Sequence, residues 1–465
     1  MEVPVPVGVF AVRIHPHPRL LEDLTSSLSQ ELSVVVVEHL AQCASCRQRL
    51  EKILGRHPEP LLEKLAEVVP WPGWVEAGYG RAIAAAEMRL LSHMRVLSAE
   101  RADAPLLLAE LLGHPPERRE MLMRNHPRFQ TWGLFERLID DVQERGFTDP
   151  QTAEELARLA LSLADVLDPS YYGAERIDDL RARAWGYIGN ARRIRFELRG
   201  AEEAFERAEI HLRSGTRDSL ERGLLLDLRA SLLRDQRQFA AAERLLLRAL
   251  QIYREVGETH RAGRTLVSLS AVYEQAGTPE RALKPLLKAL ELIDGEREPR
   301  VLLIAHHNLI TVLAEAGRFM AAQRLLIQAR PLYARFSDSR TWHHWVEGRI
   351  ARGLGQKARA EVHLQAARNG FLTEGAIYDT ALVSLELAAL YAEQKRTAEL
   401  KQLAGEILAI FSSRQIHQEA LAALSFLQQA ALAEQASLEL VAGVGSFLKR
   451  LQRDPDLSFV QPAET

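Results

Sequence analysis

The stretch that decides the fold is "LVSLSAVYEQAGTPERALKPLLKAL" at residues 266–290, because similar text recurs on both sides of it. "LRASLLRDQRQFAAAERLLLRAL" covers residues 228–250, and "LITVLAEAGRFMAAQRLLIQAR" covers residues 309–330. Four sets of residues align at intervals of forty: Gly277 and Gly317; Ala242, Ala282 and Ala322; Leu246, Leu286 and Leu326; Ala249, Ala289 and Ala329. A fixed period of this size predicts stacked copies of one supersecondary unit.

Helical periodicity dominates the chain, and Ala, Leu, Glu and Arg fill most windows, so we expect an all-α protein. Strand-like alternation is almost confined to residues 1–14. The β-branched run Val34–Val37 lowers helix propensity locally, and a short strand is the alternative there.

The repeated text resembles the tetratricopeptide pattern, with a large and a small residue on the first helix of each hairpin and alanines around a bulky residue on the second. The clearest copy has Trp185, Ile188 and Gly189, followed by Ala201, Phe205 and Ala208. The resemblance covers roughly residues 175–410 and implies a solenoid of helical hairpins. The period is about forty residues instead of thirty-four, which predicts longer helices or longer loops.

Proline-rich text at residues 56–73 predicts a domain boundary before this array. We expect a small domain at 1–55, a helical linker region at 56–127, the tetratricopeptide-like α-solenoid at 128–452 and a tail at 453–465.

The charge, hydropathy and cysteine content argue against a nucleic-acid-binding, membrane-spanning or secreted protein. The net charge of -3 provides no basic field for nucleic acid, and no apolar run is long enough to cross a membrane. The first residues include Glu2 and two prolines where a secretory signal would be basic and uninterrupted. With only two cysteines, a reducing, cytoplasmic setting is the simplest expectation.

Both cysteines lie in "SVVVVEHLAQCASCRQRL" at residues 33–50, where His39, Cys43 and Cys46 stand at helical positions i, i+4 and i+7. These positions share one face of a helix. Imidazole and thiolate are the ligands that structural Zn²⁺ prefers, and such sites take four of them. His15 or His17 is the candidate fourth ligand, which would join the first helix to the second.

This text resembles the zinc-binding anti-sigma-factor domain, whose mark is His-x3-Cys-x2-Cys followed by a basic residue, here Arg47. The resemblance covers residues 15–55 and implies a domain that binds a sigma factor, with zinc in a structural role. The family commonly places another ligand about twenty-five residues upstream of the motif, where this chain has no cysteine. The alternatives are a metal-free relic of the domain, a redox-active thiol pair or two core cysteines; a zinc–thiolate site would also sense oxidants.

The repeat register predicts a binding groove along the first helices of the hairpins. Its candidate residues are Arg183, Asn190, Arg193, Asp227, Ser231, Arg234, His307, Thr311, Trp342, Trp345, Arg349 and Arg352. Arginine and tryptophan are enriched at binding hot spots, although large aromatic residues of a repeat also fill the core between helices.

Phosphate-loop, dinucleotide, metalloprotease and nucleophile-elbow motifs are all missing from the sequence. We therefore expect a non-enzymatic regulatory adaptor that binds a protein or peptide, with a front domain that binds a sigma factor or another transcription regulator. The alternative is a scaffold of a signalling or defence complex in which the zinc domain is only structural.

Overall fold

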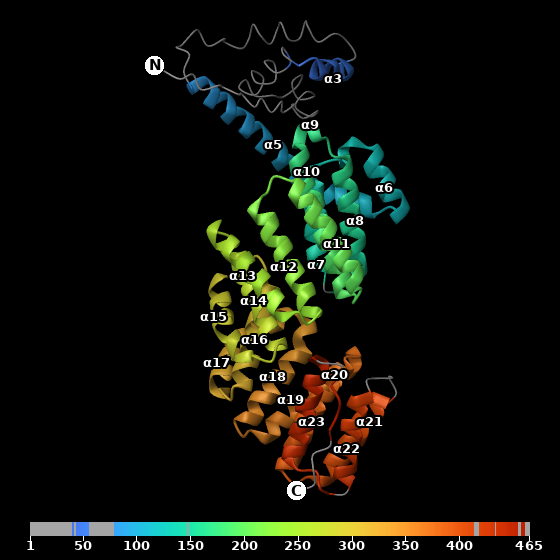
Figure 1. Ribbon diagram of the computed structural model, residues 1–465, viewed down its shortest axis with the longest axis vertical. Helices are drawn as coiled ribbons and strands as arrows, with labels where there is room; N and C mark the ends of the chain where they lie inside the picture. Colours follow the sequence, from blue (N-terminus) through green and yellow to red (C-terminus); the bar gives the residue numbers. More distant parts are fainter. Residues whose placement is uncertain are drawn as a thin grey trace. The chain divides into compact units, whose positions relative to one another are not determined.

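The computed structural model describes residues 40, 43–54, 79–146, 148–412, 418–432, 434–453 and 457–460. Helices account for all regular secondary structure in these residues, and no strand occurs among them. The chain divides into two compact units after Leu232; Figure 1 colours the helices of both along the sequence.

The first unit is built from long antiparallel helices that share one apolar core. Its elements are α3 (Ala44–Leu54), α5 (Tyr79–Leu112), α6 (Pro116–Asn125), η1 (Pro127–Phe129), α7 (Trp132–Arg145), α8 (Pro150–Val166), α9 (Pro169–Tyr172), α10 (Ala174–Ile194), α11 (Leu198–Ser214) and most of α12 (Ser219–Asp235). Residues from α3 to α11 join the core, including residues of the predicted linker region 56–127 that the structure places in α5 and α6. The predicted domain boundaries stay predictions.

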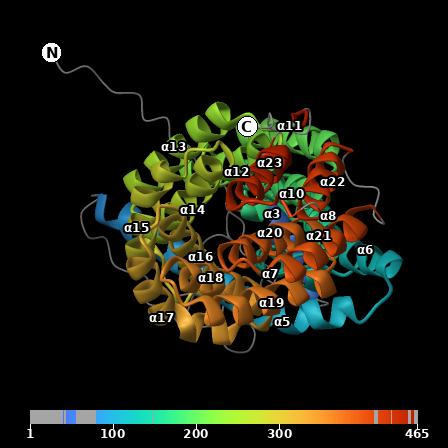
Figure 2. The same ribbon diagram turned by 90° about the horizontal axis from the view of Figure 1, so that it is seen from below.

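The second unit is a series of helical hairpins. Its elements are α13 (Phe239–Glu255), α14 (Thr259–Gln275), η2 (Pro279–Ala282), α15 (Leu283–Leu292), α16 (Pro299–Glu315), α17 (Phe319–Arg335), η3 (Ser337–Ser339), α18 (Arg340–Gly353), α19 (Lys357–Glu374), α20 (Ile377–Glu393), α21 (Thr397–Ser412), α22 (Gln418–Leu432) and α23 (Leu438–Arg453). In Figure 2 the helices α14, α16 and α18 lie on the inner side of this array, and α13, α15 and α17 lie on the outer side.

Each hairpin turns at one residue in the left-handed backbone region. These residues, with φ between 57° and 78°, are Phe196, Arg237, Gly277, Gly317, Gly355, Lys395 and Glu434. In every case the following amide donates to the carbonyl five residues earlier, as in Arg318 N to Leu313 O at 2.8 Å. This Schellman bond satisfies a carbonyl that the end of the helix leaves unpaired. The turns recur about every forty residues, as the repeat in the sequence predicts.

The long period comes from long helices, since α13, α14, α16 and α17 each hold 17 residues. Small residues bring the two helices of a hairpin close together. Ala282 and Ala322 are fully buried, and so are Ala289 and Ala329. At Gly348 of α18, an added Cβ would lie 2.8 Å from Cγ of Leu364 on α19. The alanines and glycines therefore determine how closely the helices pack.

Most of the predicted zinc domain at 1–55 lies outside the described residues, so its prediction stays untested. His15, His17, His39 and the Val34–Val37 run lie outside the described residues, and the described part shows no zinc-finger domain. None of the described helices combines the length and the apolar character needed to cross a membrane.

The left-handed turns lead to a stability prediction. Phe196 has φ 62°, and its side chain is 85% exposed, so replacing it with glycine removes backbone strain at little cost in packing. We expect Phe196→Gly to raise the free energy of unfolding by about 1 kcal/mol. Urea denaturation followed by circular dichroism measures the change.

Gly317→Ala is the matched control, because its φ is 70° and nothing lies within 4 Å of the added Cβ. Its effect is then purely conformational, and we expect a loss of about 1 kcal/mol. A lower midpoint for Phe196→Gly would contradict the argument.

Candidate functional site

A pocket of about 530 Å³ opens among the helices of the second unit. The inner helices α14, α16, α18 and α20 supply most of its lining, and α17, η3 and α23 supply the rest. Three types of side chain line it: aromatic groups, aliphatic groups such as Leu303 and Leu382, and charged groups such as Arg300, Arg349 and Lys449. A concave, largely apolar site with a few convergent polar groups is typical of a binding pocket.

The aromatic wall of the pocket is also part of the core. The Trp342 and Trp345 rings lie 5.5 Å apart by their centroids, and each packs edge-on against Phe371 of α19. Trp345 is 7% exposed, whereas Trp342 is half-buried and meets the ring of His307 at 5.6 Å. The two tryptophans thus fill the space between helices and still present ring surface to the pocket.

The cations of the pocket are bound to carboxylates. Arg349 donates from Nε to Oε1 of Glu386 at 3.0 Å and lies over the Trp345 ring at 5.0 Å. Trp345 Nε1 donates to the same oxygen at 3.1 Å. Burial alone would raise the pKa of Glu386, but the charge of Arg349 and its hydrogen bond hold that pKa below its usual value. Lys449 of α23 pairs with Glu315 at 3.2 Å, and Arg300 pairs with Asp338 at 2.7 Å.

Three polar groups here are poorly matched to their surroundings. Thr311 Oγ1 in the lining and Glu386 Oε2, which is outside the lining, are buried without a hydrogen-bond partner in the described part of the chain. Burial, and secondarily the nearby Glu374, raise the pKa of Asp379 to about 6. Groups of this kind cost free energy, and a ligand that pairs with Thr311 or Asp379 in the lining recovers part of that cost.

His307 links the pocket to the helix behind it. Its Nδ1 lies 2.9 Å from the hydroxyl of Tyr333 on α17. Burial is the first cause that lowers the pKa of His307 to about 4, and the charge of Arg349 adds to it. The imidazole is therefore neutral near pH 7, so its role in the pocket is hydrogen bonding and ring contact.

The structure brings five of the residues predicted for the groove into this pocket: His307, Thr311, Trp342, Trp345 and Arg349. Arg234 and Arg352 are outside its lining and bind Asp235 and Glu393 respectively. The other predicted residues lie in the first unit. There Arg183 donates to Glu221 at 3.1 Å from Nε, and Arg193 donates to Asn190 Oδ1 at 3.1 Å. Ser231 Oγ donates to the Asp227 carbonyl at 3.4 Å.

Sequence reasoning missed Tyr333, Asp379 and Lys449 in this pocket. The groove was predicted along the first helices of the hairpins. Tyr333 and Lys449 come from α17 and α23, which were not among the helices predicted to line it. Asp379 stands at the start of α20, where an acidic residue in the first turn is ordinary. Only the packing of α20 against α23 brings such distant residues to one place.

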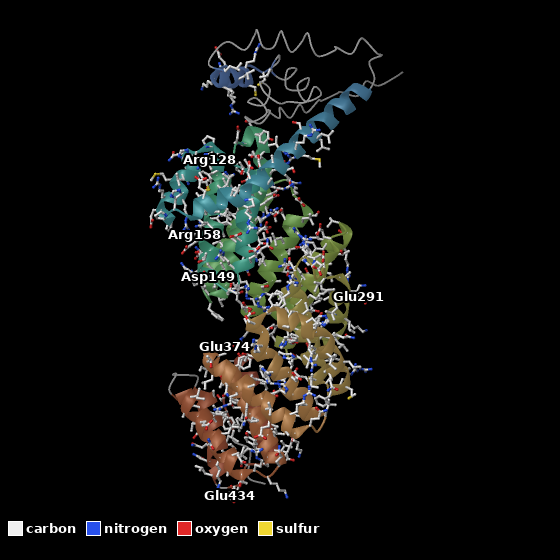
Figure 3. All side chains as sticks on the ribbon, turned by 180° about the vertical axis from the view of Figure 1, so that it is seen from behind. Arg128, Asp149, Arg158, Glu291, Glu374 and Glu434 are labelled. Atoms are coloured by element: carbon white, nitrogen blue, oxygen red, sulfur yellow. The ribbon has the colours of Figure 1, made fainter. Side chains whose placement is uncertain are left out.

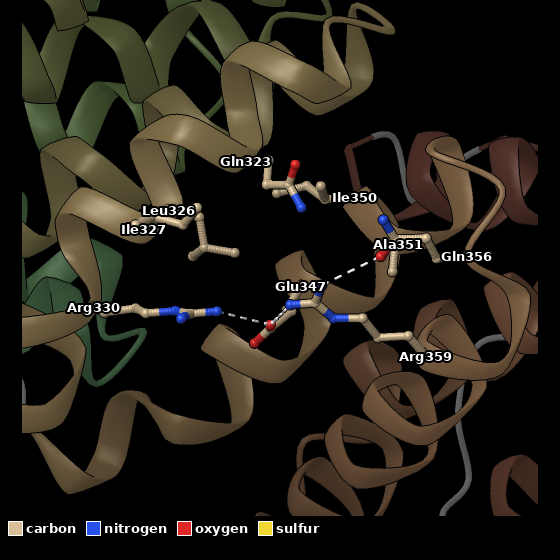
Figure 4. A pocket seen from close by; sticks show the side chains of 9 residues that line it. All are labelled: Gln323, Leu326, Ile327, Arg330, Glu347, Ile350, Ala351, Gln356 and Arg359. Carbon is tan, nitrogen blue, oxygen red and sulfur yellow. Dashed lines mark hydrogen bonds and ion pairs between the residues drawn. The ribbon is translucent and has the colours of Figure 1, made fainter.

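A smaller cavity of about 110 Å³ lies between α17, α18 and α19. Figure 4 shows Arg330 and Arg359 reaching the carboxylate of Glu347 from opposite sides. Arg330 is 3.4 Å from that carboxylate, and His343 and His363 lie 3.6 and 3.7 Å from it. Glu347 is 6% exposed, so this cluster joins three helices around one buried charge.

The two cysteines lie together at α3. Cys46 is fully buried in a cluster with Leu40 and Leu50, and Cys43 is half-buried. Burial and a hydrogen bond between the two thiols raise the pKa of Cys46 to about 12. Within the described residues, no three His, Cys, Asp or Glu side chains gather as metal ligands would. Two sulfur ligands of the predicted zinc site are thus adjacent, and the other candidates lie outside the described residues.

Comparison with known proteins agrees with the hairpin geometry. Residues 221–294 match the family model of the tetratricopeptide repeat. This part of the chain is a tetratricopeptide array. A search of curated proteins found no significant match.

Several solved structures resemble this tetratricopeptide-like chain at low sequence identity. A Rap protein complexed with competence and sporulation factor has a TM-score of 0.51 at 13% identity, over 69% of this chain and 88% of its own. The apo form of RapI has a TM-score of 0.48 at 15% identity, over 78% and 99%. Aspartyl phosphate phosphatase F from Bacillus subtilis has a TM-score of 0.41 at 13% identity, over 74% and 95%. The first of these likenesses shows a shared helical-repeat fold.

Asp379 makes the stability of the folded chain depend on pH. Its pKa is about 6 in the folded chain, against an ordinary value of 3.8, so between these two pH values the unfolded state binds fewer protons. Stability therefore falls as pH rises from about 4 to 6, and the penalty is complete above 6. We expect Asp379→Asn to raise the melting temperature at pH 7.5 and to leave it unchanged at pH 4.

Asp338→Asn is the control in the same pocket. A hydrogen bond from Arg300 lowers the pKa of Asp338, so its carboxylate stabilises the fold at neutral pH and the substitution should not raise the melting temperature at any pH. Thermal unfolding by circular dichroism at both pH values makes the comparison. An equal gain for Asp379→Asn at pH 4 and pH 7.5 would rule out titration as its cause.

Proposed function

We propose that this protein is a non-enzymatic cytoplasmic adaptor that binds a segment of a partner protein in the pocket of the second unit. The observation that carries the proposal is the pocket itself, where Trp342 and His307 present ring surface beside buried polar atoms without partners. Aromatic side chains at the centre of an interface contribute a large part of binding free energy.

The chemistry of the lining defines the partner segment. The tryptophan rings and Leu303 offer an apolar surface for one or two large side chains. Thr311 Oγ1 offers a hydrogen bond, and Asp379 offers a carboxylate that a cationic or donor group would stabilise. The positive charges of Arg349 and Lys449 are neutralised by the carboxylates of Glu386 and Glu315. Groups paired in this way favour binding of a ligand over proton transfer to it. A protein of similar fold, the Rap protein, has been solved in complex with competence and sporulation factor.

A peptide-display selection on the full chain tests the pocket. We expect peptides selected on the wild type to bind Trp342→Ala at least tenfold more weakly, because the substitution removes ring surface from the pocket. Ile304→Arg gives a second variant that spares the core, since Ile304 lines the pocket but is 38% exposed. Calorimetric titration of the selected peptides provides the affinities.

Met320→Ala is the control, because Met320 is 60% exposed on α17 and does not line the pocket. It should bind the selected peptides as the wild type does. Peptides that bind both pocket variants with wild-type affinity would place their site elsewhere.

We also propose that the front of the chain is an anti-sigma-like domain that binds a sigma factor or another transcription regulator around a structural zinc ion. The adjacent thiols of Cys43 and Cys46 support this, as does the resemblance of residues 15–55. His39 and either His17 or His15 would complete the ligand set. Zinc bound there would stabilise a short segment with little core of its own. The competing reading, a scaffold with a purely structural zinc domain, shares this metal site but has no sigma-factor partner.

Metal analysis of the purified full chain tests the zinc site. We expect about one zinc ion per chain in reduced wild-type protein and a loss of most of it in Cys43→Ser, because a thiolate ligand is removed. Ser45→Ala is the control beside the motif. Wild-type protein without zinc would overturn the metal assignment. If the protein contains zinc but binds no sigma factor from its own cell, the result would rule out the sigma-factor partner and favour the scaffold hypothesis.

A further inference from the structure

The outer side of the second unit carries a pattern that the groove does not use. On α13, α15 and α17 an exposed cation is followed three residues later by an exposed aliphatic residue. The cations are Arg244, Lys284 and Arg324, and the aliphatic residues are Leu247, Leu287 and Ile327, which are 46%, 50% and 53% exposed. We call these six residues the outer ridge. Each pair recurs at the forty-residue period, so the six side chains occupy equivalent positions on consecutive repeats.

The cations of the outer ridge make no hydrogen bond or ion pair within the part of the chain that the structure describes. Exposed cations elsewhere on outer helices do pair along their own helix, as Arg199 does with Glu203 and Arg213 with Glu209. Even Lys288, next to the ridge on α15, binds Glu291, which projects outward in Figure 3. Three positive charges beside three aliphatic groups thus remain without internal partners.

The pattern is limited to these three repeats. At the equivalent positions α11 has Glu203 and Glu206, and α19 has Val362 and Gln365. Packing therefore does not require a cation and an aliphatic residue there. In Figures 1 and 2 the helices α13, α15 and α17 follow one another in chain order along the outer side of the array, so the ridge positions recur on successive outer helices.

We propose that the outer ridge binds an acidic amphipathic helix of a partner protein. The charge is complementary, since carboxylates of such a helix would pair with the ridge cations and its aliphatic face would cover the ridge leucines and isoleucine. A leucine at every seventh position of such a helix forms one aliphatic stripe with carboxylates beside it, which matches the paired aliphatic and cationic positions of the ridge.

An anionic membrane is the other surface that attracts cations beside apolar groups. The ridge favours a protein partner, because its aliphatic side chains are only about half exposed and it contains no Trp or Phe to anchor in the membrane interface. The ridge lies on the opposite side of the hairpins from the pocket helices α14, α16 and α18, so its partner binds independently of the groove ligand.

A designed probe tests this inference directly. The probe is a synthetic 21-residue helix with three repeats of Glu-Glu-Leu-Ala-Glu-Ala-Ala, and binding to the full chain is measured by fluorescence anisotropy at 50 and 300 mM NaCl. We expect binding that weakens with salt. The variant Arg244→Glu/Lys284→Glu/Arg324→Glu should bind at least tenfold more weakly, and so should Leu247→Ser/Leu287→Ser/Ile327→Ser, because each removes one half of the complementarity.

The control variant is Arg254→Glu/Arg335→Glu/Lys357→Glu, which makes the same change in net charge at exposed cations outside the ridge. It should bind as the wild type does. A second probe with the same composition but its leucines spread around the helix should bind weakly. Equal weakening by the control, or no loss in the ridge variants, would overturn the proposal. Ridge-dependent binding to phosphatidylserine vesicles without binding to the probe would also overturn it.

Discussion

The close packing of small residues at the helix crossings is the constraint on which the rest of the structure depends. Ala282 and Ala289 of one hairpin are fully buried, and their equivalents in the neighbouring repeats are buried to the same degree. Because an alanine allows two backbones to approach, the bulky residue between the alanines can fill the space toward the next helix. Gly348 shows how little room remains, since a single added Cβ would contact the Leu364 side chain at 2.8 Å. The pocket and the outer ridge both depend on this regular spacing.

Ion pairs between neighbouring repeats also hold the array together. Arg349 and Glu386 are 37 residues apart, and Arg368 and Glu406 are 38 apart. Tyrosines join two further links of this kind. Tyr273 and Tyr391 each donate to a glutamate of the preceding hairpin, Glu243 and Glu361, and these carboxylates also pair with Arg281 and Arg396 respectively. Pairs at one repeat length hold adjacent hairpins in register, and half-buried ones contribute more than isolated surface pairs do.

These links also separate two kinds of arginine. Arg349 and Arg352 of α18 bind carboxylates of the next repeat, so they contribute mainly to the cohesion of the array. The cations of the outer ridge have no such partner. The two tryptophans differ in degree, since Trp345 is nearly buried and Trp342 is half-buried, although both line the pocket. One residue type thus serves for cohesion at some positions of the repeats and is available for recognition at others.

The sequence by itself determined the helical hairpins, their forty-residue period and the buried alanines, because these depend on local spacing that recurs along the chain. Five residues that it predicted for the groove, His307, Thr311, Trp342, Trp345 and Arg349, line the pocket, whereas Arg300, Asn308 and Glu315 of the same lining were not predicted. Left-handed turns at Phe196 and Arg237 were not visible in it, because backbone capping imposes the conformation even on residues that do not favour it.

Only the tertiary structure decided which predicted side chains meet. It placed Asp379 and Lys449 in the same pocket as Trp342, and it paired Arg183 with Glu221. Such contacts depend on how helices far apart in the chain pack together, and no local pattern records that packing.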